Sequence, residues 1–215
     1  MRAGAEPYRV HSPGLLWRFY VTLRGFEEVL VRPAAELPQA LIAHSRRDKA
    51  AASEMRAALE ETWLTIAPEL RERYRDVLRT VPPVVVVILT RRSPCGCLGH
   101  HHPPGVQTRL ARRLKAASSA AVAEVDLAYE AIREWQPLPL SDLAADPAIG
   151  SDYRREMEGF RFRLALLDVF LHELHHYAAP HAQEKEVRGR SQRFYADALN
   201  AYTQAHFGIR YGFER

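Results

Sequence analysis

The order of apolar and polar positions along the chain predicts helices on both sides of a short strand region. Between residues 33 and 80, Ala, Glu, Arg and Leu dominate and no glycine occurs, which is typical of two or three helices. Four apolar residues recur there at helical spacing and predict a buried stripe: Met55, Leu59, Trp63 and Ile66. The first half of residues 15–31 fits a strand, and the second half fits either a helix or a strand.

Two strands are predicted in the middle of the chain. Residues 84–89 read VVVVIL, a β-branched run that is apolar on both faces, as in a buried strand. Residues 121–128 alternate partly and predict a second strand, which then gives way to a Pro-rich segment. Between the strands we expect a loop over residues 91–105, rich in Pro, Gly, Cys and His, and a short basic helix over residues 107–115.

Two long helices are predicted after the strands. The first is capped by Ser151 or Asp152 and runs to about residue 179, where Pro180 limits it. The last helix covers about residues 184–206. One stripe of the first helix is apolar and predicts contact with a core: Phe160, Leu164, Leu167, Leu171 and Leu174. Helices and strands in this order indicate an α+β fold.

The composition is that of a soluble globular protein, since 47% of the 215 residues are apolar and 26% are charged. The length suits a mainly helical N-terminal lobe (residues 1–80) with a core unit (residues 81–215), or one continuous domain. No apolar run reaches the roughly 18 residues that cross a bilayer, and no signal-like segment is evident, so we expect a cytoplasmic protein without a membrane partner. The net charge of +4 is spread out, and its arginine bias suits phosphate binding or simply reflects a GC-rich coding genome.

The sequence LHELHHY near the end of the first long helix contains the candidate metal ligands and general base. His172 and His176 lie four residues apart and project from one helix face, where two imidazoles can bind one zinc ion. Glu173 is placed to act as a general base rather than as a ligand, which is the arrangement of an HExxH metallopeptidase. The structural alternative is a solvated pair of histidines that complements the helix dipole near a C-terminus.

The order of elements from residue 84 to residue 195 resembles the SprT-like group of small zinc metallopeptidases. The shared features are a strand, a glycine-containing turn at residues 96–100, a second strand, the HExxH helix, and a helix that carries RSQRFY at residues 190–195. The resemblance implies a zincin-like core, in which a small sheet packs on the HExxH helix. It also implies zinc, protein or peptide substrates, and association with DNA.

The third zinc ligand is the open point of this prediction. In the SprT-like group a histidine stands where this chain has Arg190, and a guanidinium does not bind zinc. We expect His181 or Asp197 to complete the site, with Glu186 behind them. Glu184 and Glu186 lie on a charged run that is typical of a solvated face.

The loop between the strands contains further metal-binding residue types. Cys95 and Cys97 could join a histidine in a second zinc site, although the distant second pair of ligands that such sites use is missing. A disulfide between them would be strained and would close little of the chain. His100, His101 and His102 are candidates to line the cleft, to stabilise an oxyanion or to supply the missing ligand. The alternative is a turn whose histidines point into solvent.

Three functions are compatible with these residues. The first is a zinc metallopeptidase with Glu173 as general base. The second is a non-catalytic nucleic-acid- or protein-binding module on a degenerate zincin scaffold, suggested by Arg190. The third is a metal-dependent hydrolase of other bonds. The sequence does not decide the substrate or the oligomeric state.

Overall fold

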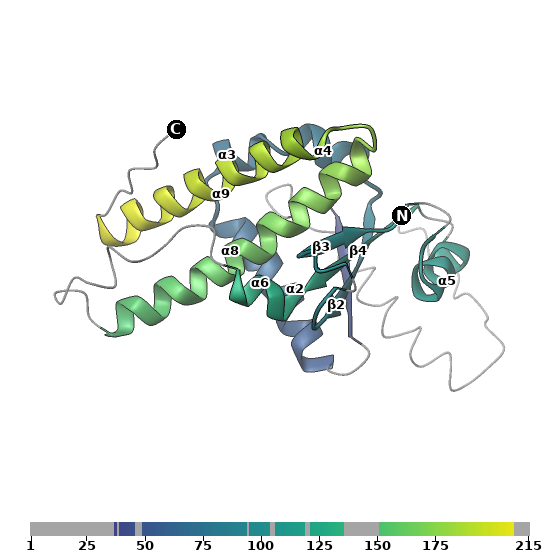
Figure 1. Cartoon of the computed structure of the whole chain (residues 1–215), viewed down its shortest axis with the longest axis horizontal. Coiled ribbons are helices and arrows are strands. Elements are labelled where there is room, and N and C mark those ends of the chain that lie inside the picture. The colour runs from purple at the N-terminus through teal and green to yellow at the C-terminus, as the bar shows by residue number, and fades with distance from the viewer. Residues whose placement is uncertain are drawn as a thin grey trace, which may run out of the picture.

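A computed structural model describes residues 37, 39–45, 49–93, 95–103, 106–118, 121–135 and 151–208. The prediction for residues 15–31 lies outside these residues. The described part has a mixed α+β fold (Figure 1). Its elements, in chain order, are β1 (Ala40–His44), α2 (Lys49–Thr65), α3 (Pro68–Glu72), α4 (Arg75–Thr80), β2 (Val84–Thr90), β3 (Gly99–His101), α5 (Arg109–Ser118), β4 (Val122–Ala128), α6 (Tyr129–Glu134), α8 (Ser151–Ala178) and α9 (Glu184–Phe207).

The strands form one sheet in the order β1-β2-β4-β3. β1, β2 and β4 are parallel, and β3 is antiparallel to β4. β2 therefore has a neighbour on each side and helices over its faces, which explains why its sequence is apolar throughout. The predictions of β2 and β4 as strands, and of α8 and α9 as long helices, are confirmed.

Two local predictions are wrong, and one short helix was not predicted. Ala40–His44 forms strand β1 where we expected helix, because five residues are too few to show a period and their pairing with β2 decides their state. Gly99–His101 forms strand β3 inside the predicted loop, held by its pairing with β4. Tyr129–Glu134 forms helix α6 between the predicted strand and the Pro-rich segment, where the sequence predicted no element.

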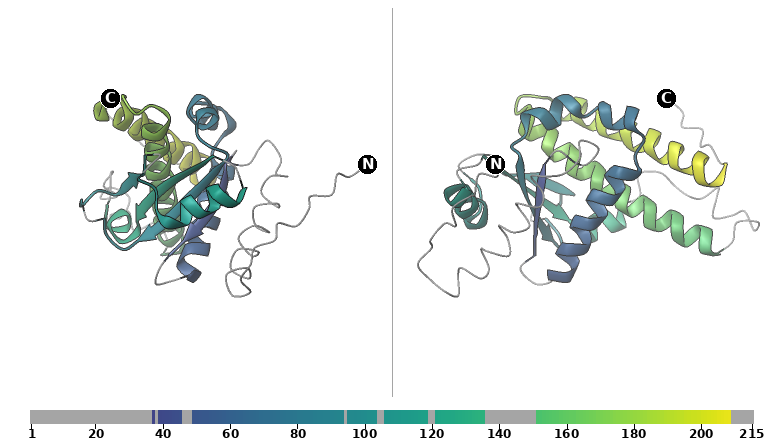
Figure 2. Two further views of the ribbon diagram at one scale, coloured as in Figure 1. Left: turned by 90° about the vertical axis from the view of Figure 1, so that its right-hand side faces the viewer. Right: turned by 180° about the vertical axis from the view of Figure 1, so that it is seen from behind.

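The sheet is covered on one face by α8 and α2, and on the other by α5 (Figures 1 and 2). The predicted apolar stripe of α8 is fully buried: Phe160, Leu164, Leu167, Leu171 and Leu174. Leu59 and Trp63 of α2 belong to the same hydrophobic core, so residues on both sides of position 80 share it. Val84 and Val86 of β2 face the other way and pack with Ala111 of α5.

Two further features of the helices matter for the site. α8 and α9 run side by side after the turn at residues 179–183 (Figure 2). In the described ranges, none of the helices combines the length and the apolar character that crossing a membrane requires.

Candidate metal centre

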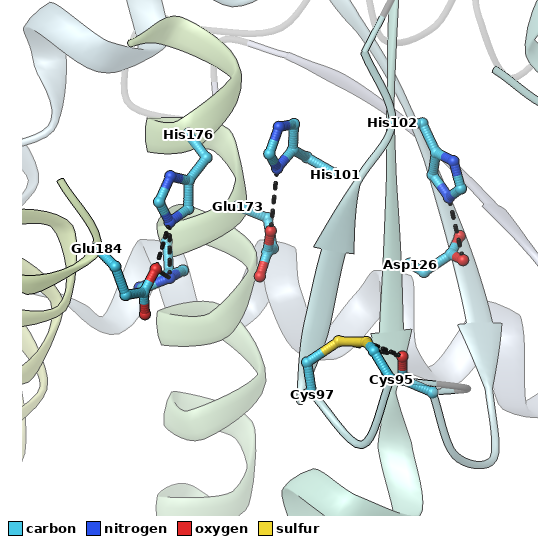
Figure 3. A network of polar contacts seen from close by, with 10 residues as sticks. Cys95, Cys97, His101, His102, Asp126, Glu173, His176 and Glu184 are labelled. Atoms are coloured by element: carbon cyan, nitrogen blue, oxygen red, sulfur yellow. Dashed lines mark hydrogen bonds and ion pairs between the residues drawn. A yellow bond between two sulfur atoms is a disulfide. The ribbon is translucent and has the colours of Figure 1, made fainter. Parts of the chain in front are cut away.

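Three possible ligand atoms converge where α8 meets the start of α9. The Nε2 atoms of His172 and His176 lie 3.2 Å apart. Glu184 Oε2 lies 2.9 Å from His176 Nε2 and 3.6 Å from His172 Nε2 (Figure 3 shows His176 and Glu184). A tetrahedral zinc ion with bonds of about 2.0–2.1 Å would have ligand atoms about 3.3–3.4 Å apart. The three atoms thus form a triangle of the size that one face of a zinc tetrahedron requires.

The turn between the two helices brings Glu184 to the histidines. α8 ends at Ala178, and the amide of Ala179 donates to the carbonyl of His175 (2.8 Å) as the chain reverses. Glu184 is the first residue of α9, where a carboxylate also complements the helix dipole. Arg188 donates to its Oε1 (2.8 Å), which leaves Oε2 turned toward the histidines.

The ionisation states of this group suit a metal site. Burial lowers the pKa of His172 below its ordinary value, which favours the neutral imidazole that a metal requires. Partial burial of Glu184 acts to raise its pKa, but the hydrogen bond from Arg188 and the nearby His172 and His176 rings outweigh it and lower the pKa. At neutral pH these shifts favour a neutral His172 imidazole and an ionised Glu184 carboxylate.

The residues that we expected to complete the site lie elsewhere. His181 and Glu186 are exposed, and neither belongs to a group of possible ligand atoms among the described residues. Asp197 forms an ion pair with Arg73 on the segment between α3 and α4. The structure brings Glu184 to the histidine pair instead, a residue that its charged neighbourhood had led us to leave unranked.

Arg190 anchors α9 to the α3–α4 segment. Its guanidinium donates to both carboxylate oxygens of Asp76 (2.7 and 3.3 Å) and to the carbonyl of Arg73. It also lies over the ring of Tyr74, 4.9 Å from the centroid. Position 190, where the resemblance expects a ligand, therefore contacts α4 and the residues before it instead of His172 and His176.

Glu173 lies beside the ligand group and is 8% exposed. His101 of β3 places Nδ1 3.4 Å from Glu173 Oε2, and its ring stacks on His176 with 5.6 Å between centroids (Figure 3). A Cβ atom on Gly99 would come within 2.7 Å of Glu173 Cγ and of Val169 Cγ1. Glycine at this position therefore allows β3 to approach α8 closely enough to enclose Glu173.

These residues open into a cleft of about 800 Å³. Its walls are the loop before β3, β3 itself, α8 and the first turns of α9, with Trp135 at one side. His172, Glu173, His176 and Glu184 all contribute to the lining. The cleft is large enough for an extended segment of a substrate to reach the ligand group.

The histidines of the predicted loop over residues 91–105 point to both sides of β3. His101 turns toward Glu173, whereas His102 turns away and pairs with Asp126 of β4 (3.1 Å; Figure 3). His100 contributes to the cleft wall, and its ring lies 5.1 Å from that of His102. Cys95 and Cys97 are joined by a disulfide, so neither sulfur is available to a metal in this structure.

Asp168 forms a buried polar contact one turn before His172. It is 2% exposed and accepts a hydrogen bond from Ser191 of α9 (2.8 Å). Burial raises its pKa to about 7, although the hydrogen bond from Ser191 opposes the rise. Sequence reasoning did not single out this residue, but an aspartate inside the apolar run ALLDVF is the signal that would have found it.

Comparisons with protein-family models, with curated proteins and with solved structures found no match to this chain. The function of the centre is therefore inferred from its own residues.

Proposed function

We propose that this protein is a zinc-dependent peptidase in which His172, His176 and Glu184 bind the metal and Glu173 is the general base. The observation that carries the proposal is the convergence of three ligand atoms within 3.6 Å of one another, beside a second, enclosed carboxylate, that of Glu173. Two imidazole nitrogens and one carboxylate oxygen are a common ligand set of catalytic zinc. Zinc bound there would lower the pKa of a coordinated water and polarise the scissile carbonyl.

Glu173 has the position and the surroundings of a general base. It follows His172 directly in α8 and lines the same cleft as the three proposed ligands without being one of them. It can accept a proton from the attacking water and pass it to the leaving amine. His101, 3.4 Å away, holds the carboxylate on the side of β3.

A peptide is the substrate that the edge of the sheet favours. In the described part of the chain β3 pairs with β4 on one side and has no strand on the other. An extended peptide can add to such an edge through main-chain hydrogen bonds. Because β3 forms part of the cleft wall, a peptide bound there would pass beside Glu173 and the ligand group.

The DNA association implied by the SprT-like resemblance is supported by α5. This helix exposes Arg112, Arg113 and Lys115, which can contact phosphates. Binding of duplex DNA should weaken steeply between about 50 and 200 mM salt, and replacing the three residues with Gln should reduce that dependence. Binding that is absent, or that does not change with salt, would remove this part of the proposal.

The proposed reaction is tested by separating metal binding from catalysis. Glu173→Gln should keep the zinc that depends on His172 and His176 and lose hydrolysis of casein by a factor of at least ~100. His172→Ala should lose both that zinc and the activity. Glu186→Gln is the matched control, an exposed carboxylate near the site that should change neither. A Glu173→Gln variant as active as the original chain would reject Glu173 as the base.

A further inference from the structure

Three polar side chains gather on the face of the sheet that is turned away from α8. His102 follows β3, and Glu124 and Asp126 belong to β4. Alternate residues of a strand point to opposite faces, and Val125 lies in the core that α8 covers. Glu124 and Asp126 therefore point to the other face, with Val122 and the helix α5. This cluster is separate from the proposed zinc centre.

The cluster has the geometry of a ligand set. One nitrogen or oxygen from each of the three residues lies within 4.8 Å of the other two. His102 Nε2 lies 3.1 Å from Asp126 Oδ2, which is close enough for an ion pair when the imidazole is protonated. Each residue keeps one buried polar atom without a hydrogen-bond partner: His102 Nε2, Glu124 Oε1 and Asp126 Oδ1.

Glu124 carries the largest cost of burying a charged group in this cluster. It is 0% exposed, and its Oε2 accepts a hydrogen bond from the amide of Thr108 (2.7 Å), next to the start of α5. That contact accounts for one carboxylate oxygen and leaves Oε1 buried and unpaired. A second carboxylate, Asp126, lies close by, and two like charges in a partly buried place repel each other. A cation between them would offset both costs.

We propose that His102, Glu124 and Asp126 bind a second divalent metal ion. One imidazole nitrogen with two carboxylate oxygens suits a first-row ion such as Mn²⁺ or Zn²⁺. The ion would join the end of β3, the middle of β4 and the loop before α5. Its role is structural, because it fastens the edge strand that carries Gly99 and His101 into the cleft.

The test uses the full chain, stripped of metal by a chelator, with the proposed zinc centre removed by His172→Ala and His176→Ala. Mn²⁺ and Zn²⁺ are titrated separately by calorimetry, and bound metal is counted by elemental analysis. We expect one ion per chain in this double variant, and a rise in its unfolding temperature when Mn²⁺ or Zn²⁺ is added. Absence of bound metal in a double variant that circular dichroism shows to be folded would overturn the proposal.

Substitutions in the double variant then assign the ion to the cluster. Asp126→Asn and His102→Gln alter partly exposed residues of similar shape and should each weaken binding at least tenfold. Glu130→Gln, a partly exposed carboxylate on α6, is the matched control and should leave binding unchanged. Unchanged affinity in Asp126→Asn would overturn the assignment. The peptidase proposal and the second-site proposal can fail separately, because the zinc centre is tested by substitutions at His172 and His176 and the second site in a chain that already lacks both histidines.

Discussion

The first two turns of α9 contain Glu184 and Arg190, six residues apart, and the two positions serve different purposes. Glu184 turns toward the histidines of α8 and belongs to the cleft. Arg190 turns toward Asp76 and Tyr74 and ties the same helix to α3 and α4. The SprT-like pattern expects a ligand at position 190, whereas the packing of α9 places the carboxylate of Glu184 beside His172 and His176. The comparison shows that the face of α9 that meets α8 decides which of its side chains lies near the two histidines.

The largest expected effect is at Glu184. Glu184→Ala should weaken zinc binding by about a hundredfold or more and abolish peptidase activity, because one of three protein ligands is lost. Competition with a chromogenic chelator measures the affinity. His181→Ala and Asp197→Ala are the contrasting variants and should retain the zinc. A larger loss in either of them than in Glu184→Ala would reverse the assignment.

The second prediction concerns Asp168, which accepts a hydrogen bond from Ser191, the residue that follows Arg190 on α9. Its pKa is near 7 in the folded chain and 3.8 is its ordinary value, so between these values the folded chain holds a proton that the unfolded chain releases. Stability contributed by this residue therefore falls as the pH rises from about 4 to 7, on the order of 1 kcal/mol per pH unit, and is constant above 7.

Asp168→Asn removes this titration while keeping an acceptor for Ser191. Relative to the original chain, the variant should gain unfolding free energy as the pH rises through that window. Urea unfolding of both chains at pH 5 and pH 8 measures the difference. Equal differences at the two values would show that Asp168 does not titrate in this range.

Gly99→Ala should disturb the cleft from the β3 side. The added Cβ would come within 2.7 Å of Glu173 and Val169, so β3 must move away from α8 at a cost of about 1–3 kcal/mol. We expect a lower kcat with little change in zinc affinity, since the ligands lie on α8 and α9. Gly189→Ala is the matched control. It lies within α9 with open space around it, so the substitution should stabilise the chain by about 0.5–1 kcal/mol.

The smallest effect on stability and zinc binding is expected for substitutions at Arg190. They test the contrast between positions 184 and 190 most directly. Arg190→Gln should lower the unfolding free energy by about 1 kcal/mol, because Asp76, its partner in the ion pair, is largely exposed. Arg190→His introduces the residue of the SprT-like pattern but should not raise zinc affinity, since this position faces α4 and the residues before it. A tighter zinc complex in Arg190→His would show that position 190 can reach the metal.

The parts of the fold that were predictable are those with a long, regular pattern. The apolar stripe of α8 and the continuous apolar run of β2 each repeat over several residues, so local sequence and tertiary packing require the same structure. The short elements β1 and β3 carry no such pattern. Each exists because a neighbouring strand supplies hydrogen-bond partners, which a local pattern does not reveal.

For the candidate site, the sequence by itself determined the pair His172 and His176, with Glu173 beside them, because helical spacing alone puts four-apart residues on one face. Only the tertiary structure decided that Glu184 joins them, that Arg190 does not, and that His101 and His102 separate to opposite sides of β3. Those outcomes depend on the angle at which α9 returns along α8 and on the register of β3 with β4. Both are set by contacts between segments far apart in the chain.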